Sequence, residues 1–453
     1  MSGFIQVSGD GHGFIDSATG ERFVPMGCNY FDPATQWPFR TWGMYDHDRV
    51  AAQFAQIAGA GLNCVRVFLD LTLSPAPGQY NEQQFAKVDD MVSLAAEHGL
   101  RIIFSGPNHN EGTPAHRQGD RFADDRQLDY CCELWTRIAE RWGNDPAVMT
   151  WDLMNEPQVG WRLPVSEARL TKWKSFAKRK LGVTVQDAPA SIPGETSRQV
   201  YRAYVRFLDE LGENWVARQC EAIRATSAKN LITVGLVQWS TPIYLAKWAG
   251  YAAVNPRRIA KHLDYMSQHF YPILKSLEEC TGPAREAGLE PEYAYQKAYC
   301  RIVGRAAYVP GKPLVMEEFG WKGGTRLPNE TTTWPQEHQT YWCDTLLQVT
   351  QDVATGWLNW AFADSPAPNT DISAASGLWT SDCKQLKHWG RRFVERASHL
   401  KKNPPRYKPA DRTIELDLAD YLYEHGGHPT HDWLIGHFAE QSDESVAVTF
   451  VDG

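Results

Sequence analysis

Short apolar runs alternate along the chain with longer segments in which apolar residues recur every three or four positions. The short runs predict buried strands, and the longer segments predict amphipathic helices. From residue 20 onward their alternation indicates βα units and a parallel sheet. Eight strands are predicted, at residues 23–29, 63–69, 101–105, 148–154, 231–236, 265–270, 313–318 and 356–360. Eight such units predict an α/β fold, a (β/α)8 TIM barrel.

Helices are predicted between the strands, at residues 48–60, 82–98, 128–142, 199–225, 293–308, 336–351 and 385–400. Gly61 and Gly99 follow helical patterns and precede strands, which is typical of short turns on the barrel floor. The segments that follow strands are longer and rich in Trp, Pro, Asn and His, notably 107–122 and 158–193. Because loops after strands form the active-site face of this fold, we expect a functional site there.

Two segments lie outside the eight units. The N-terminal segment predicts a β-hairpin around Gly9-Asp10-Gly11, which we expect to close the barrel floor. After about Lys401 the chain contains prolines and then two short strand-like pieces. The sequence therefore predicts a barrel with its N-terminal hairpin over residues 1–400 and a small β-rich appendage over residues 401–453.

The composition argues against several kinds of binding partner and site. The chain of 453 residues has 22% charged residues and a formal net charge of -8, so we expect no basic surface for nucleic acid. It contains neither a signal peptide pattern nor eighteen consecutive apolar residues, so we expect no membrane span and a cytoplasmic location. The nine cysteines include no Cys-x-x-Cys pair, which argues against a zinc ribbon, and their odd number argues against a secreted disulfide framework.

Two predicted strands end in glutamates. The fourth strand runs into Asn155-Glu156-Pro157, and the seventh ends in Glu317-Glu318. Because the carboxyl ends of barrel strands meet at one face, these side chains point toward a common centre. Cleavage of a glycosidic bond needs such a pair, since an acid protonates the leaving oxygen while a second carboxylate meets the oxocarbenium-like carbon. One carboxyl must stay protonated and the other ionised, which demands unequal surroundings.

On these motifs the chain resembles the clan A glycoside hydrolases, and within them glycoside hydrolase family 5, over roughly residues 23–400. The resemblance implies that Glu156, in Asn-Glu-Pro, is the acid/base. It also implies that Glu318, which precedes an aromatic residue and a glycine, is the nucleophile, with Glu317 as the less favoured neighbour. A retaining double displacement that uses neither cofactor nor metal follows from this assignment.

Further residues match the family order. The resemblance implies that Arg66 lies beside the nucleophile, where a permanent cation keeps a carboxylate ionised, although Arg66 could instead serve as a structural ion-pair partner. It implies that Tyr271, which shares a strand face with His269, hydrogen-bonds the nucleophile. Asn155 is implied to contact the sugar 2-hydroxyl, and Trp360 to form the floor of the glycone subsite.

The third strand departs from the family pattern. Many members place a histidine within this strand, whereas here the apolar run gives way to a loop in which His109 is the candidate substitute. His109, Glu111 and His116 also suggest a metal site, but their irregular spacing matches no rigid ligand pattern, so a solvated loop is favoured. Trp37, which lies in the loop after the first strand, either stacks on sugar or packs a lid.

The residues around Glu156 and the His-Phe-Tyr-Pro run resemble the β-mannan-acting branch of the family, the mannanases and β-mannosidases, although cellulase-like branches share similar runs. An oligosaccharide or polysaccharide substrate is thus expected. With no export signal visible, a short manno-oligosaccharide or β-mannoside is favoured at least as much as polymeric mannan. A β-1,4-glucan or β-glucoside hydrolase stays open. A non-catalytic carbohydrate-binding barrel is opposed by the paired glutamates, and a metal-dependent hydrolase by the absence of a ligand cluster after strand one.

Overall fold

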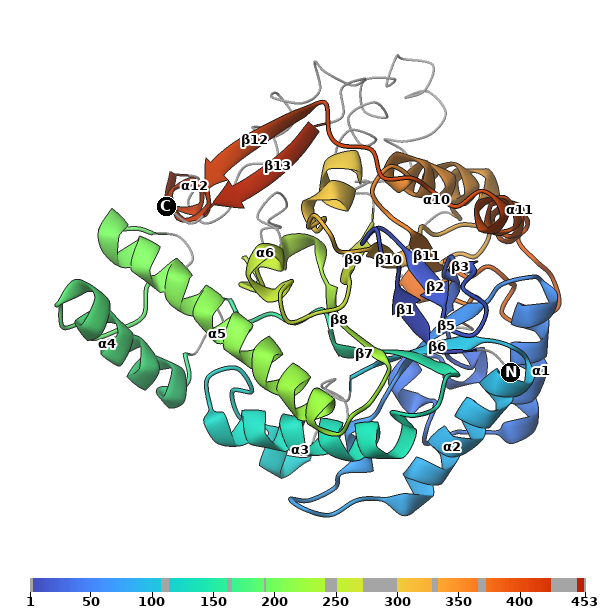
Figure 1. The fold of residues 1–453 in the computed structure, drawn as a ribbon, viewed down its shortest axis with the longest axis horizontal. Helices are drawn as coiled ribbons and strands as arrows, with labels where there is room; N and C mark the ends of the chain where they lie inside the picture. The colour runs from blue at the N-terminus through green and yellow to red at the C-terminus, as the bar shows by residue number, and fades with distance from the viewer. Residues whose placement is uncertain are drawn as a thin grey trace.

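A closed barrel of eight parallel strands forms the centre of the molecule (Figure 1). The computed structural model describes residues 3–106, 114–160, 165–190, 193–240, 251–271, 300–327, 333–365, 372–424 and 446–451. The barrel strands are β4 (Met26–Asn29), β5 (Cys64–Phe68), β6 (Arg101–Ser105), β7 (Val148–Asn155), β8 (Leu231–Leu236), β9 (Met266–Phe270), β10 (Leu314–Phe319) and β11 (Gly356–Asn359). They follow one another in chain order around the barrel, and β11 pairs with β4 to close it. The predicted (β/α)8 barrel is confirmed.

The main difference from the predicted strands concerns the first one. The predicted strand at residues 23–29 divides into the end of β3 (Arg22–Phe23) and the barrel strand β4. Pro25 lies between them, and proline has no N–H to donate to a strand ladder. Its carbonyl still accepts a hydrogen bond from Trp357 N at 2.9 Å, so the chain enters the barrel through this residue.

Helices surround the barrel (Figure 1). They are α1 (His47–Gly59), α2 (Glu82–Glu97), α3 (Asp125–Trp142), α5 (Arg198–Ala225), α6 (Pro256–Ile259), α10 (Gln336–Thr350) and α11 (His388–Lys402). Most begin where a polar side chain accepts a hydrogen bond from an N–H of the first turn, as Asp46, Asn81 and Ser197 do. Residues 300–306 of the predicted helix at 293–308 are helical, and its preceding part lies outside the described residues.

The long segment after β7 contains a helix that the sequence pattern did not predict. Helix α4 spans Glu167–Leu181, is capped by Ser166 and ends at Gly182 in the left-handed conformation. Its apolar positions are sparse, and the buried side of the helix rests largely on Trp173 and Phe176. A weak apolar stripe between two loops therefore concealed this helix.

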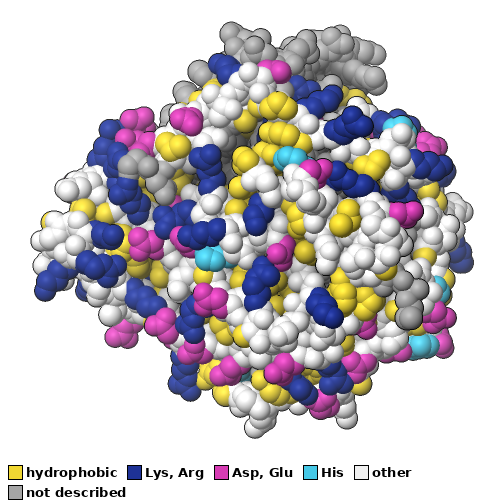
Figure 2. Space-filling view, viewed as in Figure 1, with side chains coloured by type: hydrophobic (Ala, Val, Ile, Leu, Met, Phe, Trp, Pro, Cys, Tyr) yellow, Lys and Arg dark blue, Asp and Glu magenta, His cyan; other side chains and the backbone are white. Residues whose placement is uncertain are grey.

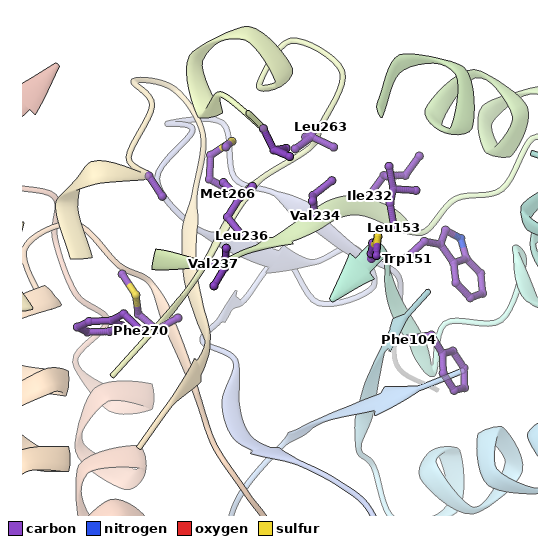
Figure 3. Close-up of a cluster of buried hydrophobic side chains, with 14 of the residues drawn as sticks. Phe104, Trp151, Leu153, Ile232, Val234, Leu236, Val237, Leu263, Met266 and Phe270 are labelled. Atoms are coloured by element: carbon purple, nitrogen blue, oxygen red, sulfur yellow. The ribbon is translucent and has the colours of Figure 1, made fainter. Parts of the chain in front are cut away.

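Side chains alternate along the strands between the barrel interior and the layer beneath the helices. Figure 3 shows Phe104, Trp151, Leu153 and Ile232 among the side chains of the outer layer, which is a single buried apolar cluster. Asp152, between Trp151 and Leu153, points the other way, into the barrel. The alternation thus places apolar residues under the helices and polar residues at the centre.

A smaller apolar cluster closes the barrel floor. Strands β1 (Ile5–Val7), β2 (Phe14–Asp16) and β3 form an antiparallel sheet. Ile5 and Phe14 pack against residues near the start of the barrel strands, among them Ile103 and Val315. The predicted hairpin and its position are confirmed, and the opposite end of the barrel is the one left for a site.

The last described residues pair β12 (Arg412–Asp417) with β13 (Val446–Val451) in parallel. Helix α12 (Leu418–Glu424), between them, packs against α5. Ion pairs join the two helices, because Arg202 lies 2.9 Å from Asp420 and Arg198 lies 2.7 Å from Glu424. Both strands were predicted, and the division of the chain near residue 400 remains a prediction.

The surface mixes charges of both signs. On the face shown in Figure 2, lysines and arginines are interspersed with aspartates and glutamates, so this face has no extended cationic patch. Within the described residues, no helix combines the length and the apolar character needed to cross a bilayer.

Candidate active site

Arg66 lies at the centre of the polar interior, in the middle of β5, and its side chain is fully buried. Nη1 donates to Glu318 Oε1 at 2.6 Å and to Asn29 Oδ1 at 2.9 Å. Nη2 donates to Asp152 at 2.6 Å and to Asn155 Oδ1 at 2.9 Å. Burial lowers the pKa of Arg66, but the carboxylates of Asp152 and Glu318 outweigh burial and raise it, so the guanidinium is a permanent cation.

Glu318 lies at the end of β10, and its side chain is only 5% exposed. Its two oxygens have different partners, because Oε1 accepts from Arg66 and Oε2 accepts from the Tyr271 hydroxyl at 3.0 Å. Burial raises the pKa of Glu318 above its ordinary value, whereas the Arg66 cation and the Tyr271 hydroxyl oppose this rise. Both contacts favour the carboxylate form, and Arg66 and Tyr271 both lie within hydrogen-bond distance of Glu318.

Glu156 follows β7 directly and is the more accessible of the two carboxyls, with 26% of its side chain exposed. Its backbone has a φ of 50°, in the left-handed region that is unfavourable for residues other than glycine. A hydrogen bond from Glu156 N to Gly235 O, 2.9 Å long, ties this turn to β8. The backbone strain is thus located at the residue that the sequence predicts as the acid/base.

His269, on β9, lies between the two glutamates. Its Nδ1 is 3.3 Å from Glu156 Oε1 and 3.5 Å from Glu318 Oε1. Burial, together with the Arg66 cation, lowers the pKa of His269 well below its ordinary value, so the ring is neutral. A glycine is required at position 235, because a Cβ there would lie 2.9 Å from His269 Nε2 and 3.0 Å from Arg66 Nη2.

Irregular strand pairing lets neighbouring residues reach the same centre. The register of β10 against β9 shifts between Val315 and Glu318, and that of β7 against β8 shifts between Asp152 and Asn155. In a regular strand adjacent side chains point to opposite faces, but such a shift re-aims them. Glu317 and Glu318, although adjacent in sequence, therefore both lie near Arg66.

Several polar residues of this network were not singled out from the sequence as site residues. Asp152, Asn29 and Ser105 all accept hydrogen bonds from Arg66. Asn29 also donates to Glu317 O at 2.7 Å, which connects β4 to β10. The sequence did contain a signal for Asp152, since an acidic residue between Trp151 and Leu153 in a buried strand must face a polar interior.

Two other predicted residues lie at the mouth. Asn155 has its Oδ1 held by Arg66, which turns its amide N–H₂ away from the guanidinium. Trp360 follows β11 and packs against Phe31 and Phe68, at centroid distances of 6.0 Å and 5.8 Å. These two rings hold the indole beside Tyr271, which packs against the same small cluster.

The structure gives little information on the remaining candidates, which are the histidine after the third strand and the possible metal ligands. His109 and Glu111 lie outside the described residues. Among those described, Glu156, His269 and Glu318 form a group of potential metal ligands whose donor atoms lie within 4.8 Å of one another. Arg66, 2.6 Å from Glu318, already supplies a fixed positive charge at this place, which would repel a metal cation. The set is better suited to proton transfer and nucleophilic attack.

Two carboxyls facing each other across the mouth of a (β/α)8 barrel, one of them bound to an arginine, define the class of glycoside hydrolase barrels. Comparison with protein families agrees with this class. The family described as Cellulase (glycosyl hydrolase family 5) matches residues 17–365, and the chain belongs to glycosyl hydrolase family 5.

Among curated proteins, the chain is similar to plant mannan-degrading enzymes. It is 24% identical over 298 residues to mannan endo-1,4-beta-mannosidase 2 of Arabidopsis thaliana, covering 56% of this chain and 58% of that protein. It is 31% identical over 138 residues to mannan endo-1,4-beta-mannosidase 8 of Oryza sativa subsp. japonica, covering 24% of this chain and 37% of that protein. The chain thus spans less than two thirds of the length of these relatives.

Solved structures share the fold over almost the whole chain. GH5_18 from Streptomyces cattleya, an alanine variant in complex with Manβ1-4GlcNAc, has a TM-score of 0.63 at 17% identity and 94% coverage of both chains. The exo-beta-1,4-mannosidase Op5Man5 from Opitutaceae bacterium strain TAV5 has a TM-score of 0.66 at 19% identity, covering 99% of this chain and 72% of that one. At these identities the likeness shows the fold alone.

Proposed function

We propose that this protein is a retaining glycoside hydrolase that cleaves β-mannosides or short manno-oligosaccharides by double displacement. The observation that carries the proposal is the separation of Glu156 and Glu318, whose nearest carboxylate oxygens lie within 4.8 Å of each other. Retaining enzymes hold their carboxyls roughly 5 to 5.5 Å apart, whereas inverting enzymes need roughly 6.5 to 9.5 Å to admit a water. A closest approach of the oxygens within 4.8 Å leaves less room for a water than the inverting arrangement needs, which supports direct attack by one carboxylate.

In the first step Glu318 attacks the anomeric carbon while Glu156 protonates the leaving oxygen, so that the glycosidic bond breaks and a glycosyl ester forms. The surroundings support this division of roles. Glu318 is buried against a cation and a tyrosine hydroxyl, which favour its ionised form. Glu156 is more exposed, and its carboxyl lies beside the neutral ring of His269.

In the second step Glu156 takes a proton from water, which attacks the anomeric carbon and releases Glu318. Neutral His269, in contact with both carboxyls, fixes their relative positions without adding charge. The amide N–H₂ of Asn155 is oriented for the sugar 2-hydroxyl, a contact that strengthens at the transition state. Trp360 offers an apolar ring face for the sugar.

The preference for mannose rests on the relatives. Curated proteins similar to this chain are mannan endo-1,4-beta-mannosidases, and the similar folds include an exo-beta-1,4-mannosidase and a protein in complex with Manβ1-4GlcNAc. The cellulase name of the family favours a second candidate, a β-1,4-glucan or β-glucoside hydrolase. Both candidates use the same pair of glutamates.

A direct comparison of substrates tests the sugar. We expect aryl β-mannoside and mannohexaose to be hydrolysed with a kcat/KM at least about tenfold above aryl β-glucoside, a ratio that corresponds to about 1.4 kcal/mol of differential transition-state binding. The Glu318→Gln variant is the matched control for background hydrolysis. A preference for the β-glucoside would select the second candidate. Binding without any turnover would instead indicate a carbohydrate-binding barrel.

The stereochemical outcome tests the mechanism. We expect the first-formed sugar to keep the β-configuration of the substrate, because two inversions at the anomeric carbon restore it. Proton NMR during the first minutes of hydrolysis measures the anomer before mutarotation. Initial release of the α-anomer would exclude the covalent intermediate on Glu318.

A further inference from the structure

A third carboxyl, Glu317, lies beneath the two glutamates of the proposed mechanism and has no part in it. Its side chain is completely buried at the centre of the barrel. The titratable and charged groups that interact with it come from several strands: Arg66 and Cys64 of β5, Asp152 of β7, Tyr265 immediately before β9, and Glu318 on its own strand. Arg66 is the one cation in this set.

Within the described residues, Arg66 donates no hydrogen bond to Glu317. The N–H groups of the guanidinium donate to Glu318, Asp152, Asn29, Asn155 and Ser105. Glu317 Oε2 lies 3.5 Å from Arg66 Nε, which instead donates to Asp152 at 3.1 Å. Within the described residues, no group meets hydrogen-bond geometry at Glu317 Oε2, although the Ser267 hydroxyl lies close enough to lower the pKa of this carboxyl, and Oε1 accepts from the Tyr265 hydroxyl at 2.5 Å.

This arrangement suits a neutral carboxylic acid. The single Arg66 cation already contacts the buried carboxyls of Asp152 and Glu318 at 2.6 Å each, whereas Glu317 lies 3.5 Å away, so a charge on Glu317 would be poorly compensated. Burial and the charge of Asp152 raise the pKa of Glu317 to about 8, against the opposing effects of Arg66, Tyr265 and Ser267. Geometry and charge thus agree that Glu317 holds a proton at neutral pH.

We propose that Glu317 is a positioning residue that acts as a neutral acid, leaving the Arg66 cation to Glu318, and that its ionisation disables the site by drawing Arg66 away. This inference rests on the proposed function of Glu318. An ionised Glu317 would compete for the Nε–H that now binds Asp152, and turning the guanidinium toward it would loosen the Nη1 contact with the nucleophile. The consequence is an alkaline limit on activity that does not belong to Glu156.

The experiment compares the wild-type full chain with Glu317→Gln on an aryl β-mannoside whose activated leaving group needs no acid, which removes protonation of Glu156 from the alkaline limb. We expect the wild type to lose kcat/KM as pH rises through about 8. Since glutamine resembles the neutral acid in shape and charge, Glu317→Gln should stay within about threefold of the wild type at pH 6 and keep its activity to about pH 9.

A second variant tests the same proposal independently, in case Glu317→Gln does not fold. Tyr265→Phe removes the hydroxyl that donates to Glu317, so it should raise the pKa of Glu317 and move the alkaline limb upward without abolishing it. Thermal unfolding at pH 6 checks that each variant is folded. An alkaline limb that stays in place in either folded variant, or a loss of activity at every pH in folded Glu317→Gln, would overturn the proposal.

Glu318→Gln separates this inference from the function on which it rests. We expect it to lose at least about a thousandfold of kcat/KM at every pH, because it removes the nucleophile itself. If Glu318→Gln is inactive and Glu317→Gln shows no change in its alkaline limb, the role of Glu317 is wrong and the proposed function stands. If Glu318→Gln stays active while Glu317→Gln does not, the nucleophile has been misassigned.

Discussion

Replacing either Glu156 or Glu318 by alanine is expected to lower turnover of an unactivated manno-oligosaccharide by at least about a thousandfold, since each variant loses a group that takes part in bond making or breaking. The two variants should differ on an activated aryl β-mannoside. Glu156→Ala still forms the glycosyl ester there, and added azide, which needs no general base, should restore turnover and yield a β-glycosyl azide. Glu318→Ala has no nucleophile to form the α-linked glycosyl ester from which azide would release a β-glycosyl azide, so it should gain no such product.

Glu156→Gly provides a matched control. Glycine has no Cβ, so it adopts a φ of 50° without strain. The free energy of unfolding of Glu156→Gly should therefore be about 1 kcal/mol higher than that of Glu156→Ala. Both variants should lose the same activity. The comparison separates loss of the carboxyl from any change in folding. Wild-type turnover of an unactivated oligosaccharide by Glu156→Ala would contradict the assignment of the acid/base.

The barrel could be predicted from sequence because each strand carries a continuous apolar run and each helix an apolar stripe. Strands β6 and β8 begin and end at the predicted residues. The two clear departures have local causes. Pro25 interrupts the first predicted strand, and α4 has too few apolar positions to show a helical period.

The positions of the two glutamates were also accessible from sequence, because a residue at the carboxyl end of a barrel strand must face the mouth. The residues that surround the two glutamates were harder to predict from sequence. The network around Arg66 joins residues from β4, β5, β6, β7 and β10, and the register shifts in β7 and β10 decide which of them reach it. Hydrophobic periodicity carries no information about such shifts, so the burial of Glu317 beside Glu318 emerged only from the structure.

Replacing Arg66 by methionine is expected to raise the activation barrier by about 2 to 4 kcal/mol and to move the acidic limb of the pH-rate profile upward. The sign follows from the contact at 2.6 Å with Glu318 Oε1, since removing the cation removes the influence that lowers the pKa of Glu318. The nucleophile is active as the carboxylate, so activity would then be lost at a higher pH as the solution is made more acidic. Initial rates on aryl β-mannoside between about pH 4 and 8 measure this limb.

Two further variants separate the electrostatic role of Arg66 from a structural one. Arg66→Met leaves Asp152 without its ion-pair partner, so it should also lower thermal stability. Arg66→Lys keeps a charge but lacks the planar fork that contacts Asp152 and Glu318 together. Its acidic limb should therefore move upward by less than that of Arg66→Met. Tyr271→Phe, which removes the hydrogen bond to Glu318 Oε2 and leaves the Arg66 cation in place, should shift the same limb upward by less. If folded Arg66→Met keeps the wild-type profile and loses only stability, Arg66 is a structural ion pair, and the nucleophile must be held ionised by other groups.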